Sequence, residues 1–516
     1  MFSTILSGAV YGIESYLVHV EVDLSSGLPC FVMVGSLGNE VKESAERVRI
    51  ALKNTGISIP PMHISVNLSP ADLRKEGTGF DLPIAIGVLQ AMERIDFDCT
   101  DGMLFVGELG LNGEIKPVKG VLPIVISAWK SGITRCMVAQ ENVNEARAVT
   151  GMKVLGVEDL QSVIYYLGLP KEERERHLLA EGKAGKQKGK EQKKKRAGID
   201  FSEIAGQESI KRAALVAAAG FHNMLITGPP GSGKTMVAKR IPTILPPLSP
   251  EESLEVSSIY SIAGLLPQEG TLLTERPFLS PHHTISPQAL SGGGRIPKPG
   301  VISLAHRGVL FLDELPEFKR QTLDLLRQPL EDKEIQIARS SGSFIYPADV
   351  MLIGAMNPCP CGYYPDRNKC RCTPHEIHNY LSHISGPILD RIDLCVEACR
   401  IDIGKLKAVS GGEDSQSMRK KVMRARKRQE ERYRGTTFRF NADLSAGKIA
   451  TYCHLGEREM KMAEKLFVTL GLSARSYHRL LKVARTVADL EESDSIQEKH
   501  LAEAACYQNT DKLGRC

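Results

Sequence analysis

The length, composition and charge of the chain exclude several classes of protein. Its 516 residues, of which 42% are hydrophobic and 25% charged, suit an ordinary globular protein of about three domains and exclude a disordered or fibrous one. The net charge is only +5, and residues 183–196 carry eight basic side chains against one acidic, so the remainder is slightly acidic and the chain is not basic throughout, as many nucleic-acid-binding proteins are.

The cysteines and the hydropathy pattern predict a cytoplasmic protein. The longest apolar run, near 121–127, is far shorter than the roughly 20 residues of a membrane span, and the N-terminus lacks the basic region of a secretory signal. In the reducing compartment that this implies, a cluster among the twelve cysteines indicates metal binding rather than disulfides.

Residues 1–168 have the pattern of a mixed α/β domain. A period-two run at 16–24 predicts a half-buried strand, and we expect 29–34 to pair with it as a hairpin. Residues 169–198 follow as a basic linker, which is too polar to bury enough apolar surface to offset the entropy of ordering it. We interpret this linker as a solvated tether, and nucleic-acid binding or a targeting signal stays as the alternative.

Residues 199–402 alternate strands and helices, as a parallel α/β domain does, and contain a phosphate-binding loop. An apolar strand at 224–227 enters this loop and a helix follows it, which is the context that the G-x-x-x-x-G-K-[ST] pattern requires. The glycines let backbone N–H groups turn toward phosphate oxygens at a helix N-terminus. We expect Lys234 to reach the β- and γ-phosphates of ATP and the Thr235 hydroxyl to ligate Mg²⁺. The loop comprises Gly228, Pro229, Pro230, Gly231, Ser232, Gly233, Lys234 and Thr235.

Two further strands are expected to deliver polar side chains to the same edge of the sheet. An apolar strand at 308–312 ends in Asp313 and Glu314, and α/β sheets bind ligands at the carboxyl ends of their strands. Asp313 is expected to hold Mg²⁺ through water, and Glu314 to polarise the attacking water. The strand at 350–356 ends at Asn357, whose amide would orient that water; an ordinary turn residue before proline is the alternative.

With these motifs the chain resembles an AAA+ ATPase, and three more stretches sharpen the resemblance. They are FSEIAGQ at 201–207, SGPILDRID at 385–393 and GLSARSYHR at 471–479. Together they resemble the YifB/ComM family of the magnesium-chelatase-like branch, over nearly the whole chain. The resemblance implies a P-loop AAA+ core at 199–402, a C-terminal helical lid of the magnesium-chelatase type at 403–516, and Mg²⁺-dependent ATP hydrolysis by a ring, most simply a hexamer.

The resemblance also implies roles for two arginines. Arg391 occupies the position of an arginine finger, which would act on the nucleotide of a neighbouring subunit, and Arg475 occupies the sensor-2 position. A guanidinium suits both tasks because it is always charged and forks onto phosphate oxygens. A surface ion pair is the alternative for each.

Two insertions, expected to face away from the phosphate chemistry, are candidates for contact with DNA. One is the Pro-, Gly- and His-rich segment 276–300, and the other is 335–346, whose alternation around Ser-Ser-Gly predicts a β-hairpin. Related ring helicases carry pore-facing inserts at these places. By resemblance, Arg295, Lys298 and Arg339 are candidate DNA-phosphate contacts, and ordinary surface loops are the alternative.

Four cysteines form a pattern that is typical of a metal site. Two C-x-C pairs are separated by eight residues, and four thiolates suit a closed tetrahedral Zn²⁺ site of structural type. The alternative is an unligated reduced loop, and His375 or His378 could substitute for a thiolate. The four residues are Cys359, Cys361, Cys370 and Cys372.

Residues 1–168 resemble the Lon-protease-like member of the ribosomal S5 domain 2 fold, on the evidence of KEGTGFD at 75–81 and the stretch 107–120. A serine–lysine protease needs a hydroxyl and a desolvated amine within hydrogen-bond reach. In this alignment Gly79 occupies the serine position and Leu122 the lysine position. We therefore predict a catalytically inactive domain that binds DNA, a partner or its neighbours in the ring.

The expected function is that of a ring-forming ATPase acting on single-stranded or branched DNA, as a helicase or branch-migration factor in recombination or natural transformation. Three alternatives stay open: a chaperone-like or scaffold AAA+ protein, the motor subunit of a magnesium chelatase, and an ATP-dependent protease, which Gly79 and Leu122 oppose. ATP and Mg²⁺ are the expected cofactors, with a structural Zn²⁺, and no membrane partner is expected.

Overall fold

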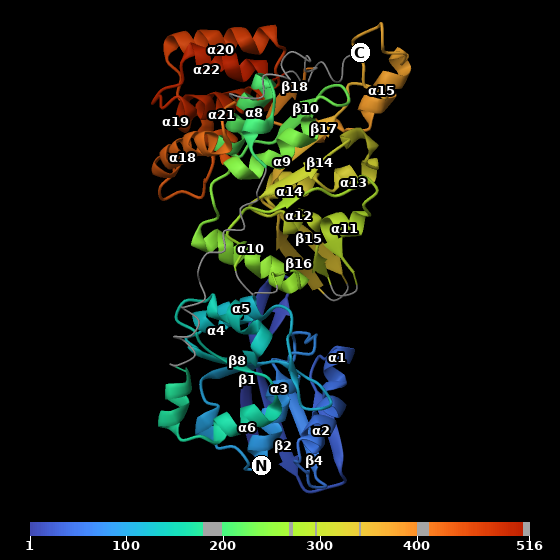
Figure 1. The fold of residues 1–516 in the computed structure, drawn as a ribbon, viewed down its shortest axis with the longest axis vertical. Coiled ribbons are helices and arrows are strands. Elements are labelled where there is room, and N and C mark those ends of the chain that lie inside the picture. The colour runs from blue at the N-terminus through green and yellow to red at the C-terminus, as the bar shows by residue number, and fades with distance from the viewer. Residues whose placement is uncertain (179–198, 268–271, 295–296, 340–341, 400–411, 509–516) are drawn as a thin grey trace.

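A computed structural model describes residues 1–178, 199–267, 272–294, 297–339, 342–399 and 412–508 (Figure 1). The molecule is elongated, with the N-terminal part at one end, and with the central sheet and the C-terminal helices side by side toward the other end. The basic run at 183–196 and Arg295 lie outside the described residues. In the described part of the chain, no helix is both long and apolar enough to cross a bilayer.

The N-terminal part is built on a seven-stranded mixed sheet with the strand order β3-β4-β2-β1-β5-β8-β9. Its apolar residues gather in a core between this sheet and helix α3, every residue of which is buried. The main strands are β1 (Phe2–Tyr11), β2 (Glu14–Ser25), β3 (Cys30–Val34), β4 (His63–Ser69), β5 (Met103–Val106), β8 (Arg135–Ala139) and β9 (Lys153–Val157), with the short pair β6 (Glu108–Leu109) and β7 (Ile115–Lys116). The helices are α1 (Asn39–Lys42), α2 (Ser44–Asn54), α3 (Asp81–Ala91), α4 (Val121–Lys130), α5 (Val143–Arg147) and α6 (Leu160–Gly168).

The predicted hairpin between 16–24 and 29–34 is wrong. Strand β3 instead runs parallel to β4, and β2 lies between β1 and β4, antiparallel to both. A strand has only two hydrogen-bonding edges, so none is left on β2 for β3. Strand β1, which takes the edge of β2 away from β4, was not predicted. Its buried and exposed residues do not alternate regularly, since residues 7–9 are all buried.

The central part contains a five-stranded sheet in which every neighbouring pair runs parallel, in the order β11-β14-β17-β10-β18. All residues of β14 and β17 are buried, as expected for parallel strands that are covered on both faces. The strands are β10 (Met224–Thr227), β11 (Phe278–Leu279), β14 (Val309–Leu312), β17 (Met351–Met356) and β18 (Leu394–Glu397). The helices are α8 (Glu208–Gly220), α9 (Lys234–Ile244), α10 (Pro250–Ala263), α11 (Pro287–Ser291), α12 (Val301–Leu304), α13 (Arg320–Asp324), α14 (Arg327–Asp332), α15 (Pro374–Ser382) and α16 (Gly386–Leu389).

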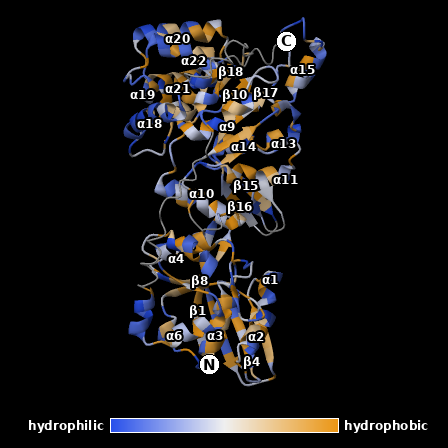
Figure 2. Cartoon of the chain, viewed as in Figure 1, coloured by the Kyte–Doolittle hydropathy of each residue, from blue (hydrophilic) through white to orange (hydrophobic). Residues whose placement is uncertain are grey.

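The C-terminal helices share one hydrophobic core with α8 and α9 of the central part. Their outer surfaces are hydrophilic, most clearly on α18 and α20 (Figure 2). Several cations of the basic stretch 419–434 are used within the fold: Arg426 stacks 3.7 Å from the centre of the Phe440 ring, and Arg432 forms an ion pair with Asp489. The helices are α18 (Ser415–Arg432), α19 (Ala446–Tyr452), α20 (Glu457–Thr469), α21 (Ala474–Leu490) and α22 (Glu498–Cys506). The α/β fold class and the helical C-terminal region are as predicted.

The N-terminal part contacts the central part through α10 and through a hairpin of β15 (Glu334–Arg339) and β16 (Gly342–Pro347), which confirms the predicted hairpin. The Gly120 N–H donates to the Ser261 carbonyl (3.2 Å), and the Ser261 hydroxyl donates to the buried Glu145 carboxyl, whose pKa is raised by burial. The Tyr11 ring lies 4.5 Å from the ring of Phe344 on β16. The hairpin is therefore attached to the N-terminal sheet.

Candidate nucleotide-binding site

The phosphate-binding loop connects β10 to the first residue of α9. Gly231 and Gly233 have φ angles of 75° and 88°. These angles lie in the left-handed region, which glycine adopts without the steric strain that a β-carbon would cause. A β-carbon on Gly228 would lie 2.6 Å from the Ala398 side chain, so the loop also needs a glycine at its entrance. These turns direct the N-terminus of α9 toward the place where phosphates are bound in such loops.

The Lys234 ammonium lies inside the loop and is held by three oxygen acceptors. It donates to the carbonyls of Gly228 (2.7 Å) and Pro229 (3.0 Å) and to Asn357 Oδ1 (3.0 Å). Burial lowers the pKa of Lys234, and the nearby Asp313 and Glu314 carboxylates partly oppose this shift. Because β17 pairs directly with β10, the amide at the end of β17 reaches the lysine of the loop.

The hydroxyl of Thr235 and the carboxylate of Asp313 meet across the sheet edge. Thr235 Oγ1 donates to Asp313 Oδ2 at 2.7 Å, and Asp313 Oδ1 accepts the N–H of Glu314 at 3.0 Å. Both side chains offer hard oxygen ligands, which Mg²⁺ prefers. The Thr235 hydroxyl and the Asp313 carboxylate would therefore fit a magnesium ion, beside the loop that would hold the phosphates.

The Glu314 carboxylate contacts a residue that sequence reasoning missed. Glu314 has a left-handed φ of 52°, and its Oε2 lies 3.4 Å from Nδ1 of His283, whose ring packs edge-on against Phe318. His283 belongs to the insertion 276–300. The expectation that this insertion faces away from the phosphate chemistry is therefore wrong for the part around His283. No periodicity or spacing links a loop histidine to an acid 31 positions later, so only the folded chain shows the contact.

The two predicted arginines lie near each other in the chain's own fold. Arg391 donates to the Pro387 carbonyl (2.7 Å) and forms an ion pair with Glu331, which leaves its side chain 15% exposed. Arg475, in the first turn of α21, lies 3.6 Å from the carboxylate of Asp390 and is exposed. Among the described residues, neither guanidinium forms a hydrogen bond or ion pair with the phosphate loop of its own chain.

Two of the three candidate DNA contacts come together on one surface. Lys298, on β13 (Lys298–Pro299), pairs with Gly293 on β12 (Gly292–Gly293). The Arg339 guanidinium would lie 3.3 Å from a β-carbon on that same Gly293. Both cations are exposed, so the insertion and the hairpin, which are distant in sequence, present them side by side.

The four cysteines of the two C-x-C pairs form one cluster. Their sulfurs all lie within 4.8 Å of one another, and the Cys361 and Cys370 sulfurs are 3.6 Å apart. A tetrahedral Zn²⁺ with Zn–S bonds of about 2.3 Å would require sulfur separations of about 3.8 Å, so the cluster fits this ion. His375 and His378 are not among its members.

The cysteine loop packs directly on the phosphate loop. Gly362 has a φ of 81°, and a β-carbon there would overlap the ring of Pro230. The loop also begins two residues after Asn357, the residue that contacts Lys234. A change in the conformation of the cysteine loop could therefore displace two parts of the nucleotide site: Pro230, through Gly362, and Asn357, through the chain that joins it to Cys359.

The protease-like positions of the N-terminal part carry no paired hydroxyl and amine among the described residues. Leu122 is fully buried in the core, and the Thr78 hydroxyl donates to the Glu108 carboxylate. The amine of Lys75 donates to the Leu73 carbonyl at 2.7 Å. The catalytically inactive N-terminal domain stays a prediction.

Comparison with known proteins assigns the chain to a family. Residues 200–406 match the family described as magnesium chelatase, subunit ChlI, and residues 20–142 and 412–508 match two further ChlI families, the latter its C-terminal part. The chain is 43% identical over 508 residues to the competence protein ComM of Haemophilus influenzae, covering 98% of this chain and 97% of that protein. It is 43% identical over 513 residues to YifB of Escherichia coli, covering 99% and 98%.

A shorter similarity links it to the magnesium-chelatase 38 kDa subunit of Rhodobacter capsulatus, with 28% identity over 183 residues that cover 32% of this chain and 52% of that protein. The two full-length relatives are covered almost completely, and the three matched segments together span most of this chain. The chain thus belongs to the YifB/ComM family of magnesium-chelatase-like AAA+ proteins.

Proposed function

We propose that this protein hydrolyses ATP with Mg²⁺ and uses the energy to move along DNA as a ring-forming helicase or branch-migration motor. Family membership supports the ATPase role. The observation that carries it is the meeting of three strand ends, in which Lys234 contacts Asn357 and Thr235 contacts Asp313. Such a cluster at the carboxyl edge of a parallel sheet suits a nucleotide triphosphate.

Each side chain of the site has a task that its chemistry suits. Lys234 binds the β- and γ-phosphates, and Thr235 with Asp313 holds the Mg²⁺, which neutralises the charge on the phosphate oxygens. Glu314 takes the proton of the attacking water, and Asn357 orients that water. Arg391 and Arg475 act on phosphate oxygens, with Arg391 reaching the site of a neighbouring subunit in a ring.

DNA is the proposed substrate because the exposed cations Lys298 on β13 and Arg339 on β15 both lie beside Gly293. Cations of this kind bind phosphates and release counterions, which gives affinity without sequence preference. The relative from Haemophilus influenzae is named a competence protein. That name favours a role in recombination or natural transformation for this chain as well.

We expect single-stranded and four-way-junction DNA to stimulate ATP hydrolysis severalfold. The double variant Lys298→Ala/Arg339→Ala should lose most of this stimulation and keep its basal rate, because it removes two proposed DNA-phosphate contacts and leaves Lys234, Thr235 and Asp313 in place. The matched control Lys130→Ala/Lys153→Ala removes two exposed lysines from the N-terminal part. Rates should be measured between 50 and 200 mM salt. ATP hydrolysis that no DNA stimulates would favour the scaffold alternative.

We also propose that the cysteine cluster holds one structural Zn²⁺ per chain. Elemental analysis should find one zinc in the purified protein, and Cys359→Ser/Cys370→Ser should lose it and lower Tm by about 5 °C or more, since structural zinc contributes folding energy. The ATPase rate should also fall, because Gly362 packs on Pro230. Cys506→Ser, at an exposed cysteine outside the cluster, should change neither. Full metal-free activity and unchanged Tm would contradict the proposal.

A further inference from the structure

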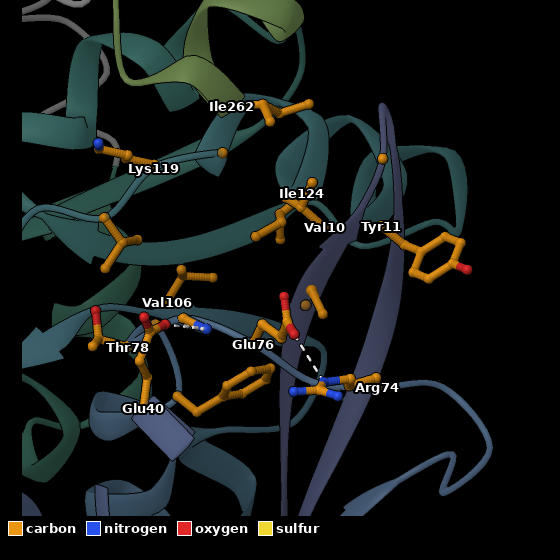
Figure 3. Close-up of a pocket in the computed structure, with 18 of the residues that line it drawn as sticks. Val10, Tyr11, Glu40, Arg74, Glu76, Thr78, Val106, Lys119, Ile124 and Ile262 are labelled. Carbon is orange, nitrogen blue, oxygen red and sulfur yellow. Dashed lines mark hydrogen bonds and ion pairs between the residues drawn. The ribbon is translucent and has the colours of Figure 1, made fainter. Parts of the chain in front are cut away.

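We propose that the N-terminal part binds an extended polypeptide segment in a cleft beside strand β1. The cleft has a volume of about 430 Å³, within the range of ligand sites, and lies where the N-terminal sheet meets the central part (Figure 3). One wall is the end of β1, and the opposite wall is formed by the loops 76–80 and 117–120. Ile262 of α10 and Phe344 of the hairpin close it from the side of the central part.

The end of β1 offers backbone hydrogen-bonding groups to this cleft. Met1 and Leu24 exchange both of their backbone hydrogen bonds, and the register between β1 and β2 then runs without a break to Tyr11. Hydrogen-bonded pairs alternate along an antiparallel ladder, so the odd-numbered residues of β1 bond to β2 and the even-numbered ones face the other way. Val10, which lines the cleft, is one of the latter.

Nothing in the described part of the chain pairs with this edge of Val10. Strand β5 packs beside β1, but the one register pair between them is Leu6 with Leu104, and β5 ends at Val106, which forms part of the cleft. No loop donates a backbone hydrogen bond to Val10 or accepts one from it in the described residues. β1 lies inside the sheet between β2 and β5, so this edge is unpaired only at the end of β1, beyond the last register pair with β5. Unpaired backbone groups of a strand are a template for another strand. The cleft therefore has the geometry for addition of one strand.

The chemistry of the cleft selects a polypeptide over a nucleic acid. Strand addition uses N–H and C=O groups in alternation, which a polypeptide has and a nucleic acid lacks. The carboxylates that line the cleft balance its cations, and Arg74 is already paired with Glu76 at 2.8 Å. Apolar side chains cover much of the remaining wall, namely Val10, Phe80, Val106, Val118, Ile124, Ile262 and Phe344. The occupant is thus an extended segment with apolar side chains at alternate positions.

Polypeptide binding goes beyond the proposed function, and its site is separate from the nucleotide site, although Lys298, a proposed DNA contact, also lines the cleft. A bound segment would touch both the N-terminal sheet and Phe344, which lies on the same hairpin as Arg339. Within the cleft, the Thr78 hydroxyl donates to Glu108, and the Lys119 side chain lies against Gly264.

The test is binding of a permanently unfolded probe, fluorescein-labelled reduced and carboxymethylated α-lactalbumin, to the full-length protein by fluorescence anisotropy. Gly79→Leu should weaken binding at least tenfold, because a β-carbon there meets Val106 and Val118 of the cleft wall at 3.4 and 3.8 Å. Gly168→Leu, where a β-carbon meets only open space, is the matched control and should bind normally. Both variants should retain the ATPase rate of the wild type, which reports that they fold.

Amide hydrogen exchange gives a second measurement that does not depend on a variant. The probe should slow exchange of the Val10 amide at least tenfold, and Val10→Pro, which removes that donor but no bond to β2, should weaken binding. Equal affinity for wild type, Gly79→Leu and Val10→Pro would overturn the proposal, as would an absence of binding. Protection of the Val10 amide by single-stranded DNA instead of the probe would reassign the cleft to nucleic acid. None of these three results would affect the ATPase proposal, whose readout is hydrolysis.

Discussion

Replacing Arg391 by alanine is expected to lower the rate of ATP hydrolysis by about three to five orders of magnitude, which is the usual contribution of an arginine finger. The affinity for ATP should stay within a few-fold of the wild type. The guanidinium forms no contact with the phosphate loop of its own chain in the described residues, where its partners are Glu331 and the Pro387 carbonyl. Arg391 precedes β18, so it lies at the amino end of the parallel strands, on the edge opposite the phosphate loop. An arginine so placed can act on the nucleotide of the next subunit. Turnover at saturating ATP and binding of a fluorescent ATP analogue measure the two effects.

The action between subunits can be tested by mixing two inactive variants. Arg391→Ala has an intact nucleotide site without the finger, and Lys234→Ala has the finger without a working site. Mixed rings should regain activity, because an intact site then lies beside an intact finger. Glu331→Gln, which removes the ion pair but keeps the guanidinium, is the matched control and should remain active. Unchanged turnover in Arg391→Ala would reduce this residue to a surface ion pair.

Replacing Glu314 by glutamine is expected to lower turnover by about two to four orders of magnitude, the usual contribution of a general base. The amide has the size of the carboxylate but takes no proton from water. Magnesium and ATP should still bind, since Thr235 and Asp313 are unchanged. Single-turnover hydrolysis with a parallel binding measurement separates the two effects, and a glutamine variant that hydrolyses ATP normally would remove Glu314 from the mechanism.

The contact between Glu314 and His283 allows one sharper comparison. In the structure the imidazole lies 3.4 Å from the carboxylate, so His283→Ala should leave the basal rate unchanged or raise it, because the base is freed. His282→Ala is the matched control: the His282 ring lies 4.1 Å from that of His283, but its own hydrogen bond is to Thr284 and not to Glu314. A loss in His283→Ala as large as that in Glu314→Gln would show that the histidine itself takes part in proton transfer.

Much of the nucleotide site was predictable because it consists of local patterns attached to strand ends. The loop ending at Lys234, the acids at 313–314 and Asn357 each follow an apolar strand, and parallel strands bring their carboxyl ends to one edge. The cysteine cluster was predictable for the same reason, since its two pairs are close in sequence. Distances between these side chains, such as 3.0 Å from Lys234 to Asn357, still came only from the fold.

By itself, then, the sequence determined the class of the fold, the phosphate loop, its acids and the cysteine pairs, because short-range periodicity and spacing encode all four. Tertiary structure alone decided which strand took which edge: β3 pairs with β4, and β1 keeps the edge of Val10 unpaired beside a cleft. It also brought His283 to Glu314. Periodicity shows which face of a strand is buried, but pairing between strands is settled by competition among all edges of the sheet, and no local pattern records that competition.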